Sequence, residues 1–333
     1  GWTVDGEGKA MHKSLGNGVD PADIFNKYGA DILRLWAASA DYHADVRCSD
    51  AIFKQLSQNY LKFRNTARYC LGNLDGFDPN NLVAPADMLE LDRWAVTRLN
   101  ALIEKCAQAY NDYEFLVVTH AVNDFCVVEL SNFYLDIIKD RLYCEKRDSV
   151  LRRAAQTAMY DILSSLTRLV APILVFTAEE IWQHLPASKE LDMESVFFNE
   201  MPAKVNIPVS DAFNAKWDRI YRVRNDVLKA LEPKRASKEI GKSTDAKITL
   251  TCSDELYEQL KAVEEELPAA FIVSQVEIVK GSEGEVAGDT EGLFVTATLA
   301  DGEKCERCWL HDHTVGSDPE HPTLCARCAA AVR

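Results

Sequence analysis

From about Ser49 to Leu185, apolar residues recur at helical spacing almost without interruption. Steps of three and four residues between apolar positions are typical of the buried face of an amphipathic helix. Three such faces can be read, and Pro172 predicts a kink or break in the third. Their members are Leu91, Trp94, Ala95, Leu99, Leu102, Ile103, Cys106 and Tyr110; Val118, Val122, Phe125, Phe133 and Ile137; and Ala155, Ala158, Ile162, Leu166, Leu169, Ile173, Ile181 and Trp182. Long helices joined by short loops predict a mainly α fold built on an antiparallel bundle.

The pattern differs on either side of this stretch. Before it, WTVDGEG predicts a strand and hairpin, Asp20 and Pro21 begin a helix that ends at Gly29, and ADILRLWAAS predicts a second helix. After it, a helix containing Trp217 is expected to stop at Pro233. A small α/β subdomain is predicted here. Its strands are KITLTC, FIVSQVEIV and LFVTATL, and its acidic helix is DELYEQLKAVEEEL.

Four of the ten cysteines stand in two C-x2-C pairs near the C-terminus: Cys305 with Cys308, and Cys325 with Cys328. Their spacing is typical of a zinc ribbon, in which four thiolates close a tetrahedral shell around one structural Zn²⁺. A thiol redox pair and disulfides are the alternatives, and three histidines between the pairs, His311, His313 and His321, could replace a cysteine. The other six cysteines lie singly among apolar neighbours and are expected in the core.

Composition limits the possible partners. With 37 Lys and Arg against 52 Asp and Glu, the net charge of −15 argues against a general electrostatic attraction to nucleic acid, so an RNA site must be local. Residues 217–242 are locally basic, and Arg219, Arg222, Lys234 and Arg235 are candidate phosphate contacts, although a solvated helix face is the alternative. No apolar run approaches the ~18 residues of a membrane span, so a membrane protein is excluded.

The loop from Lys9 to Asn17 adds a second candidate site. MHKSLGN and the following DPADIFNKYGADILRLWAASADYHADVRCS resemble the signature loop of class I aminoacyl-tRNA synthetases and its continuation in the isoleucine, valine and leucine group. Two segments, LDRWAVTRLN and NFYLDIIKDRLY, resemble the anticodon-binding bundle of bacterial-type isoleucyl-tRNA synthetases. Two others, KCERCW and LCARC, resemble the C-terminal zinc ribbon of these enzymes. The opening at Gly1 rather than Met suggests a fragment, the C-terminal third or so of such an enzyme.

The resemblance implies roles for the loop. Met11, His12, Lys13 and Ser14 would contact ATP, bound with Mg²⁺ in the intact enzyme, and Lys13 would stabilise the departing pyrophosphate as the catalytic residue. This sequence departs from the family pattern at Ala10, where a lysine is usual, and at His12, where a serine is usual. The family's other ATP signature, H-x-G-H, is absent, so the chain alone is predicted to bind tRNA and zinc without catalysing the reaction.

The resemblance also implies a partner and a division into domains. The bundle and the ribbon would hold the anticodon stem and loop of isoleucine tRNA, and Arg307 and Trp309 beside Cys308 could contact a base. Alternatively, Trp309 caps the core of the ribbon. The expected domains are the end of the catalytic core with its ATP loop and a tRNA stem-contact region (1–48), the bundle (49–205), an α/β junction (206–300) and the ribbon (301–333).

The intact protein would be a monomeric, cytoplasmic isoleucine–tRNA ligase that receives ATP and isoleucine through absent N-terminal domains. A valine or leucine synthetase, a stand-alone tRNA-binding protein, and a thiol redox or zinc-storage protein are the alternatives.

Overall fold

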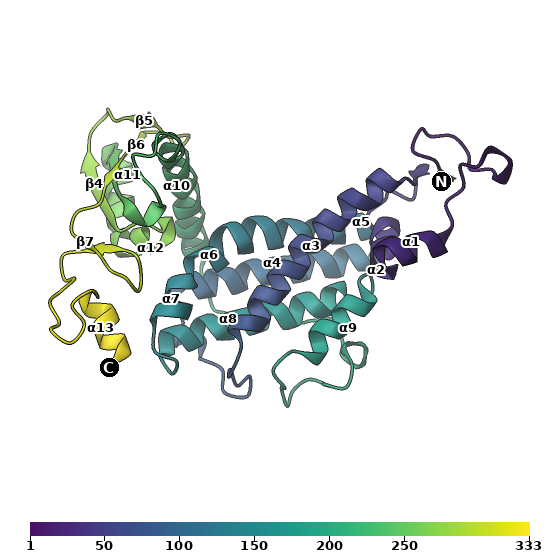
Figure 1. Cartoon of the computed structure of the whole chain (residues 1–333), viewed down its shortest axis with the longest axis horizontal. Helices are drawn as coiled ribbons and strands as arrows, with labels where there is room; N and C mark the ends of the chain where they lie inside the picture. The colour runs from purple at the N-terminus through teal and green to yellow at the C-terminus, as the bar shows by residue number, and fades with distance from the viewer. The chain divides into compact units, whose positions relative to one another are not determined.

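The computed structural model describes all 333 residues, Gly1–Arg333. The chain forms two compact units, which are described separately (Figure 1). Unit 1 contains Gly1–Asp136 and Val150–Pro208, and unit 2 contains Ile137–Ser149 and Val209–Arg333. No helix is long and apolar enough to cross a membrane.

Unit 1 begins with two short strands and two short helices. β1 (Thr3–Val4) pairs in parallel with β2 (Val46–Arg47). The expected hairpin is present in a short form, as a turn over residues 6–8 closed by a single antiparallel bridge from Val4 to Ala10. α1 (Pro21–Tyr28) starts as predicted, because the Asp20 side chain accepts a hydrogen bond from the N–H of Ala22. It ends at Gly29, whose φ of 88° suits glycine, and α2 (Ala30–Ala38) follows.

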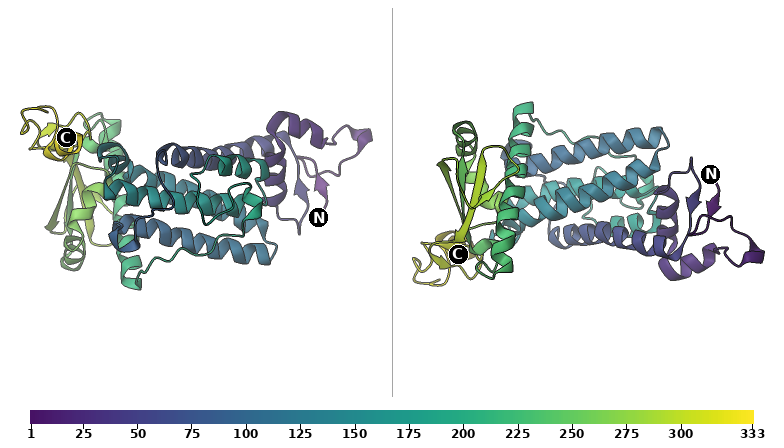
Figure 2. Two further views of the ribbon diagram at one scale, coloured as in Figure 1. Left: turned by 90° about the horizontal axis from the view of Figure 1, so that it is seen from below. Right: turned by 90° about the horizontal axis from the view of Figure 1, so that it is seen from above.

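The remainder of unit 1 is the predicted helical bundle, whose helices lie side by side in all three views (Figures 1 and 2). Its elements, in chain order, are α3 (Asp50–Asn73), η2 (Pro85–Asp87), α4 (Glu90–Asn111), α5 (Phe115–Asp124), η3 (Phe125–Tyr134), α6 (Leu135–Ile137), α8 (Val150–Val170), α9 (Val175–Gln183) and η4 (Val196–Phe198). Trp94, Phe125, Phe133 and Trp182 are buried in it. The mainly α fold and the core role of these aromatic residues are therefore confirmed.

The helix expected around Val118 to Ile137 is not uniform. After α5, the segment η3 is a π-helix, with hydrogen bonds to the fifth residue along the chain rather than the fourth. Phe125 and Leu130, five residues apart, are both buried. A π-helical segment brings residues at this spacing onto one face, which a pattern of three- and four-residue steps does not anticipate.

The break expected at Pro172 lies between α8 and α9, and two residues of α2 fix its geometry. Asp31 accepts hydrogen bonds from the Thr177 N–H (2.8 Å) and hydroxyl (2.5 Å), and from a second amide at the start of α9. Arg34 donates to the carbonyl oxygens of Pro172 (2.7 Å) and Ile173 (3.0 Å). The polar backbone groups freed by the break thereby gain partners.

Unit 2 contains a four-stranded sheet with helices. Its sheet has the order β4-β3-β6-β5, with β3 parallel to β4 and antiparallel to β6. The elements are α7 (Lys139–Cys144), α10 (Asp211–Ala236), η5 (Ser243–Asp245), β3 (Ala246–Cys252), α11 (Asp254–Lys261), η6 (Glu264–Glu266), α12 (Leu267–Phe271), β4 (Gln275–Lys280), β5 (Val286–Ala287) and β6 (Leu293–Leu299). Trp217 on α10 is buried, and the predicted α/β character is confirmed.

Three predicted boundaries in unit 2 are wrong. α10 does not stop at Pro233 but continues to Ala236; a proline this close to the end removes only its own donor, and Leu231 in the preceding turn is fully buried. The acidic helix ends at Lys261. The strand predicted from Phe271 begins at Gln275, because Phe271 belongs to α12, which has Pro268 in its first turn.

Residues from about 303 onward form the ribbon, with β7 (Glu303–Lys304), β8 (His311–Asp312) and α13 (Ala326–Val332). β7 and β8 pair antiparallel across the first cysteine pair. α13 begins directly after Cys325.

Candidate functional site

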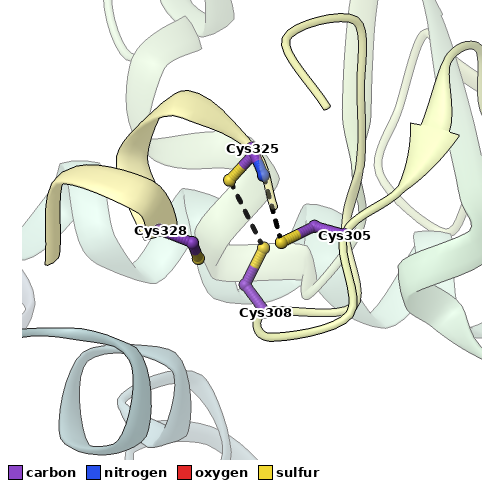
Figure 3. A group of neighbouring side chains, drawn as sticks. All are labelled: Cys305, Cys308, Cys325 and Cys328. Carbon is purple, nitrogen blue, oxygen red and sulfur yellow. Dashed lines mark hydrogen bonds between the residues drawn. The ribbon is translucent and has the colours of Figure 1, made fainter. Parts of the chain in front are cut away.

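The four ribbon cysteines converge on one point (Figure 3). Cys305 and Cys308 lie in the turn between β7 and β8, while Cys325 precedes α13 and Cys328 lies in its first turn. Their four sulfur atoms all lie within 4.8 Å of one another, and Cys308 Sγ is 3.9 Å from Cys325 Sγ. Three of the four cysteines are buried and Cys308 is partly so.

The surroundings of the sulfurs act on their ionisation in both directions, and burial holds the pKa of Cys328 well above its usual range. Burial by itself disfavours ionisation of Cys305, but three backbone N–H groups in the turns point at its sulfur and lower its pKa to about 7. Burial raises the pKa of Cys308 to about 11, while the guanidinium of Arg327 favours its charged form. Arg327 also holds the carboxylate of Asp140 on α7 at 2.5 and 2.8 Å.

This donor set fits Zn²⁺. Zinc–sulfur bonds of about 2.3 Å in a tetrahedron place the sulfurs roughly 3.8 Å apart, close to the 3.9 Å observed, whereas a disulfide needs about 2.05 Å. The histidine alternative is not supported for His311, whose ring nitrogens face the carbonyl of Gly302 (3.0 Å) and the carboxylate of Asp245 (3.4 Å). Four thiolates leave no open position, so such a zinc would be structural.

Arg307 and Trp309 do not form the expected pair. The Arg307 guanidinium lies 3.4 Å from the carbonyl oxygens of Tyr143 and Cys144, at the C-terminal end of α7. Trp309 is 54% exposed and therefore does not cap a buried core; its ring instead lies under the Lys242 ammonium, 4.4 Å from the ring centroid. The cation beside the exposed indole is therefore Lys242. Sequence spacing could not predict this pair, because Lys242 and Trp309 are far apart in the chain.

Trp309 also has an unusual backbone. Its φ of 64° lies in the left-handed region, where a non-glycine residue costs about 1 kcal/mol or more. Its N–H donates to the carbonyl of Cys305 (2.9 Å), so this conformation closes the turn that carries the first cysteine pair. Glycine would adopt this backbone conformation without strain, so a tryptophan at this position points to a functional role for its indole.

The basic segment 217–242 divides into free and paired cations. Arg222 is exposed and Arg219 partly exposed on α10, and neither makes an ion pair or hydrogen bond within the chain. Lys234 instead bridges Glu239 (3.0 Å) and Glu285 (2.7 Å), and Arg235 donates to the hydroxyl of Ser243. Arg219 and Arg222 are therefore the more available pair for phosphate.

The loop that resembles the ATP signature is folded back on the N-terminal strand by Asn17. Its side chain accepts from the His12 N–H (2.9 Å) and donates to Asp5 (2.9 Å) and to the Ala10 carbonyl (3.1 Å). Lys13 lies in η1 (Lys13–Leu15), and Gly16 closes this turn with φ 62°.

The cations of the loop differ in availability. Lys13 is exposed beside His12 and Ser14 and makes no contact with an acid, whereas Lys9 pairs with Glu7 (2.7 Å). Met11 is partly buried and packs against the core cluster of α1, α2 and α3.

Comparison with known proteins finds three family matches along the chain. Residues 92–250 match the anticodon-binding domain of tRNA ligases, residues 1–49 match the class I tRNA synthetases for I, L, M and V, and residues 302–331 match the zinc finger found in FPG and IleRS. The zinc-finger match and the four-cysteine cluster together support a structural zinc.

The relatives whose alignments cover the whole of this chain are isoleucine–tRNA ligases. Identity is 46% to that of Caldanaerobacter subterraneus subsp. tengcongensis, 48% to that of Geobacter sulfurreducens and 47% to that of Bacillus mycoides. Each alignment covers 100% of this chain and 36% of the relative. A LeuRS–tRNA–LeuAMS complex from Agrobacterium radiobacter K84 matches 61% of this chain and 23% of its own at 20% identity, with a TM-score of 0.48, too low to support an argument.

The names of these relatives favour an isoleucine–tRNA ligase over a valine or leucine synthetase, as the ribbon predicted. With the anticodon-binding and zinc-finger matches in the same chain, they also disfavour a protein whose role is redox or zinc storage alone. The chain spans about 36% of the length of the curated relatives that it matches. Over that span, the chain is similar to isoleucine–tRNA ligases at 46–48% identity, and it matches an anticodon-binding domain of tRNA ligases and the zinc finger found in FPG and IleRS.

Proposed function

We propose that this chain is the tRNA-binding portion of an isoleucine–tRNA ligase, which activates isoleucine with ATP and esterifies it to its tRNA. The observation that carries the proposal is the similarity of 46–48% over the whole chain to isoleucine–tRNA ligases, together with a four-thiol site where the zinc finger of that family matches. Isoleucine and ATP would be bound largely by domains beyond this chain. We also propose that the intact ligase is a cytoplasmic monomer with the four domains predicted from the sequence.

The ribbon supplies a surface suited to a nucleobase. An exposed indole offers a flat face for stacking, and the Lys242 ammonium beside it adds positive charge where a phosphate would follow the base. Single-stranded RNA loops are recognised by such stacking, together with hydrogen bonds to the base edges. Arg219 and Arg222, both free of acidic partners, would add phosphate contacts.

The zinc would support RNA binding indirectly, by fixing the structure of the ribbon. When bound, it links the turn at Cys305 to the start of α13, and this turn sets the backbone of Trp309. Arg307 connects the same turn to α7. The ion would therefore hold the indole in place rather than touch the RNA.

Lys13 would serve the chemical step in the intact ligase, with ATP bound as its Mg²⁺ complex. A cation stabilises the negative charge that develops on departing pyrophosphate, and Lys13 is exposed without an acid to neutralise it. The Asn17 hydrogen bonds would set the shape of the loop at residues 10–12. Lys9 is held by Glu7, which makes it a poor substitute for the lysine that Ala10 replaces.

The test is a binding titration of the chain against isoleucine tRNA and against the same tRNA with its anticodon replaced, at fixed salt, with zinc present and after chelation. We expect the native anticodon to bind more tightly and chelation to remove the preference. Trp309→Ala should weaken binding by roughly 1–3 kcal/mol while zinc stoichiometry stays at one ion.

Trp2→Ala is the matched control, because Trp2 is also exposed but lies in unit 1. Equal binding of both RNAs before and after chelation would contradict a recognition role for the ribbon. In the intact ligase, Lys13→Ala should slow isoleucine-dependent exchange of pyrophosphate into ATP while leaving tRNA affinity unchanged. The chain by itself should show no such exchange.

A further inference from the structure

A cavity of about 440 Å³ lies in unit 1, where α2, α3 and α5 meet the break between α8 and α9. This volume falls within the range of pockets that bind small organic molecules, about 300–1,000 Å³. The cavity shares no residue with the four-cysteine site, with the loop of residues 9–17 or with the free cations Arg219 and Arg222. None of the sites described above therefore accounts for it.

The floor of the cavity is apolar and its wall is fixed. The hydroxyl of Tyr60, one of the lining residues, lies 3.1 Å from the Thr177 Oγ1, and Thr177 in turn donates to Asp31 of α2 at 2.5 Å. A site held in this way loses little conformational entropy when a molecule binds. The buried side chains that line the cavity are Phe63, Val118, Val122, Val170, Ile173 and Leu174.

Three amide side chains also line the cavity: Gln55 and Asn59 on α3, and Asn123 on α5. None of them has a hydrogen-bond partner in the chain, and the Oδ1 atom of Asn123 is buried. A buried acceptor without a donor is unfavourable, and buried polar groups in proteins are nearly always paired. An N–H group carried by a bound molecule would supply the missing donor.

The charges around the cavity disfavour an anion. No lysine or arginine lines it, and the carboxylate of Asp124 does. Asp124 is exposed and makes no ion pair within the chain. A phosphate or carboxylate group would therefore be repelled, whereas an uncharged or cationic molecule would not. A bare hydrocarbon chain would fill the floor but leave the three amides without partners.

We propose that this cavity binds a small organic molecule that has an apolar body, an N–H donor for the Asn123 Oδ1 and no negative charge. The body would lie on the buried floor, and the donor would face α5. Because the lining comes from α2, α3, α5 and the break after α8, the bound molecule would also hold α2 against the bundle. This site would be additional to the proposed tRNA-binding function.

The experiment titrates the whole isotope-labelled chain with four indoles and follows its amide resonances by nuclear magnetic resonance. Indole is uncharged and has one N–H donor, while N-methylindole has nearly the same shape without the donor. Tryptamine adds a positive charge and indoleacetate a negative one. The titrations are run at pH 8, where histidine side chains are usually uncharged, because His120 also lines the cavity.

Indole should shift the amides of the lining residues with a dissociation constant on the order of 1 mM or tighter. It should bind roughly 3- to 10-fold more tightly than N-methylindole, because only indole satisfies the buried acceptor. Tryptamine should bind roughly 5-fold or more tightly than indoleacetate, because Asp124 lines the cavity.

Two variants locate the binding, and circular dichroism checks that each is folded. Asn123→Leu keeps the size of the side chain but removes the acceptor, so it should bind indole and N-methylindole equally. Asn111→Leu is the matched control, because Asn111 is an exposed asparagine outside the cavity, and it should keep the preference for indole. Thr119→Trp places a large side chain at the lining and should abolish binding of all four probes.

Equal affinities of the wild-type chain for indole and N-methylindole would overturn the inference, because water would then satisfy Asn123. The same holds if indole shows no saturable binding up to about 10 mM. Tighter binding of indoleacetate than of tryptamine would show that the ligand class is wrong. These comparisons need only the wild-type chain, so they decide the question even if a variant fails to fold.

Discussion

Replacing Cys328 with serine tests whether zinc folds the ribbon. Cys328 is fully buried in the first turn of α13, and its sulfur belongs to the four-sulfur cluster (Figure 3). A hydroxyl is neutral at pH 7 and a poor ligand for zinc, so the variant leaves an incomplete shell. The substitution changes one atom and leaves the chain otherwise intact.

The expected magnitude follows from what else the ribbon buries. Between residues 301 and 333 the buried side chains are the ligands Cys305, Cys325 and Cys328, together with Ala329 and Asp318. There is thus almost no apolar core to replace the metal. Structural zinc contributes about 10–16 kcal/mol of apparent binding energy in zinc-finger peptides. Since loss of a group that merely orients a ligand weakens metal affinity 10- to 100-fold, loss of a ligand should cost more than about 100-fold.

The assay has two readouts: zinc per chain after dialysis, and hydrogen exchange of the amides at residues 302–331. Wild type should retain one zinc and protected ribbon amides. Cys328→Ser should lose the zinc and most of that protection, while the sheet of β3, β4 and β6 stays protected.

Cys144→Ser is the matched control. Cys144 packs against the ribbon cysteines and donates to the Arg307 carbonyl at 3.6 Å, but it is not one of the four clustered sulfurs. It should keep one zinc and lose only about 1 kcal/mol of stability. If Cys328→Ser retained tightly bound zinc, or kept its ribbon amides protected without it, the assignment of a four-cysteine structural site would be wrong.

Three further predictions concern carboxylates that are buried, as Asp31 and Asp226 are, or partly buried, as Asp161 is. Asp31→Ala should lower the free energy of unfolding of unit 1 by about 2–3 kcal/mol in urea denaturation, because the start of α9 loses its capping group; a loss under 0.5 kcal/mol would contradict this role. Burial raises the pKa of Asp161 to about 7, so the folded state holds that proton more tightly than the unfolded state and stability should fall as pH rises from about 4 to 7. Asp161→Asn should remove that component of the slope and stabilise the protein at pH 8 by at most about 4 kcal/mol, with little change at pH 4. Asp226→Ala should cost about 2 kcal/mol and speed hydrogen exchange of the amides of Asp289 and Thr290, which donate to this carboxylate at 2.6 and 3.1 Å; unchanged exchange would refute that contact.

Local sequence signals predicted the helices well because the signals are themselves local. Asp20, Pro21 and Gly29 mark the ends of α1, and α8 and α9 are separated at Pro172, since capping and the lack of a proline donor act within one turn. Pro233 shows the limit of such reasoning. A proline predicts a helix end only where no packing holds the next turn, and the buried residues of α10 hold it here.

The functional residues likewise divide into those that local sequence predicted and those that only the folded structure revealed. The paired cysteines were readable because two residues between thiolates suffice to place both on one ion. The free state of Arg219 and Arg222 could not be predicted, because the sequence showed a basic segment but not which of its cations pair with acids. Exposure and the lack of a partner are properties of the folded surface, and the same composition would also suit a helix paired with acids from elsewhere.

The sequence by itself determined the mainly α architecture, the four-cysteine site and, through its resemblance to a family, the expected tRNA partner. These depend on periodicity and spacing over a few residues. Only the tertiary structure decided that Lys242, rather than Arg307, accompanies Trp309, that Asp31 caps α9, and which cations remain free. Those contacts join residues that are distant in the chain, and no local pattern encodes which distant side chain will fill a given space.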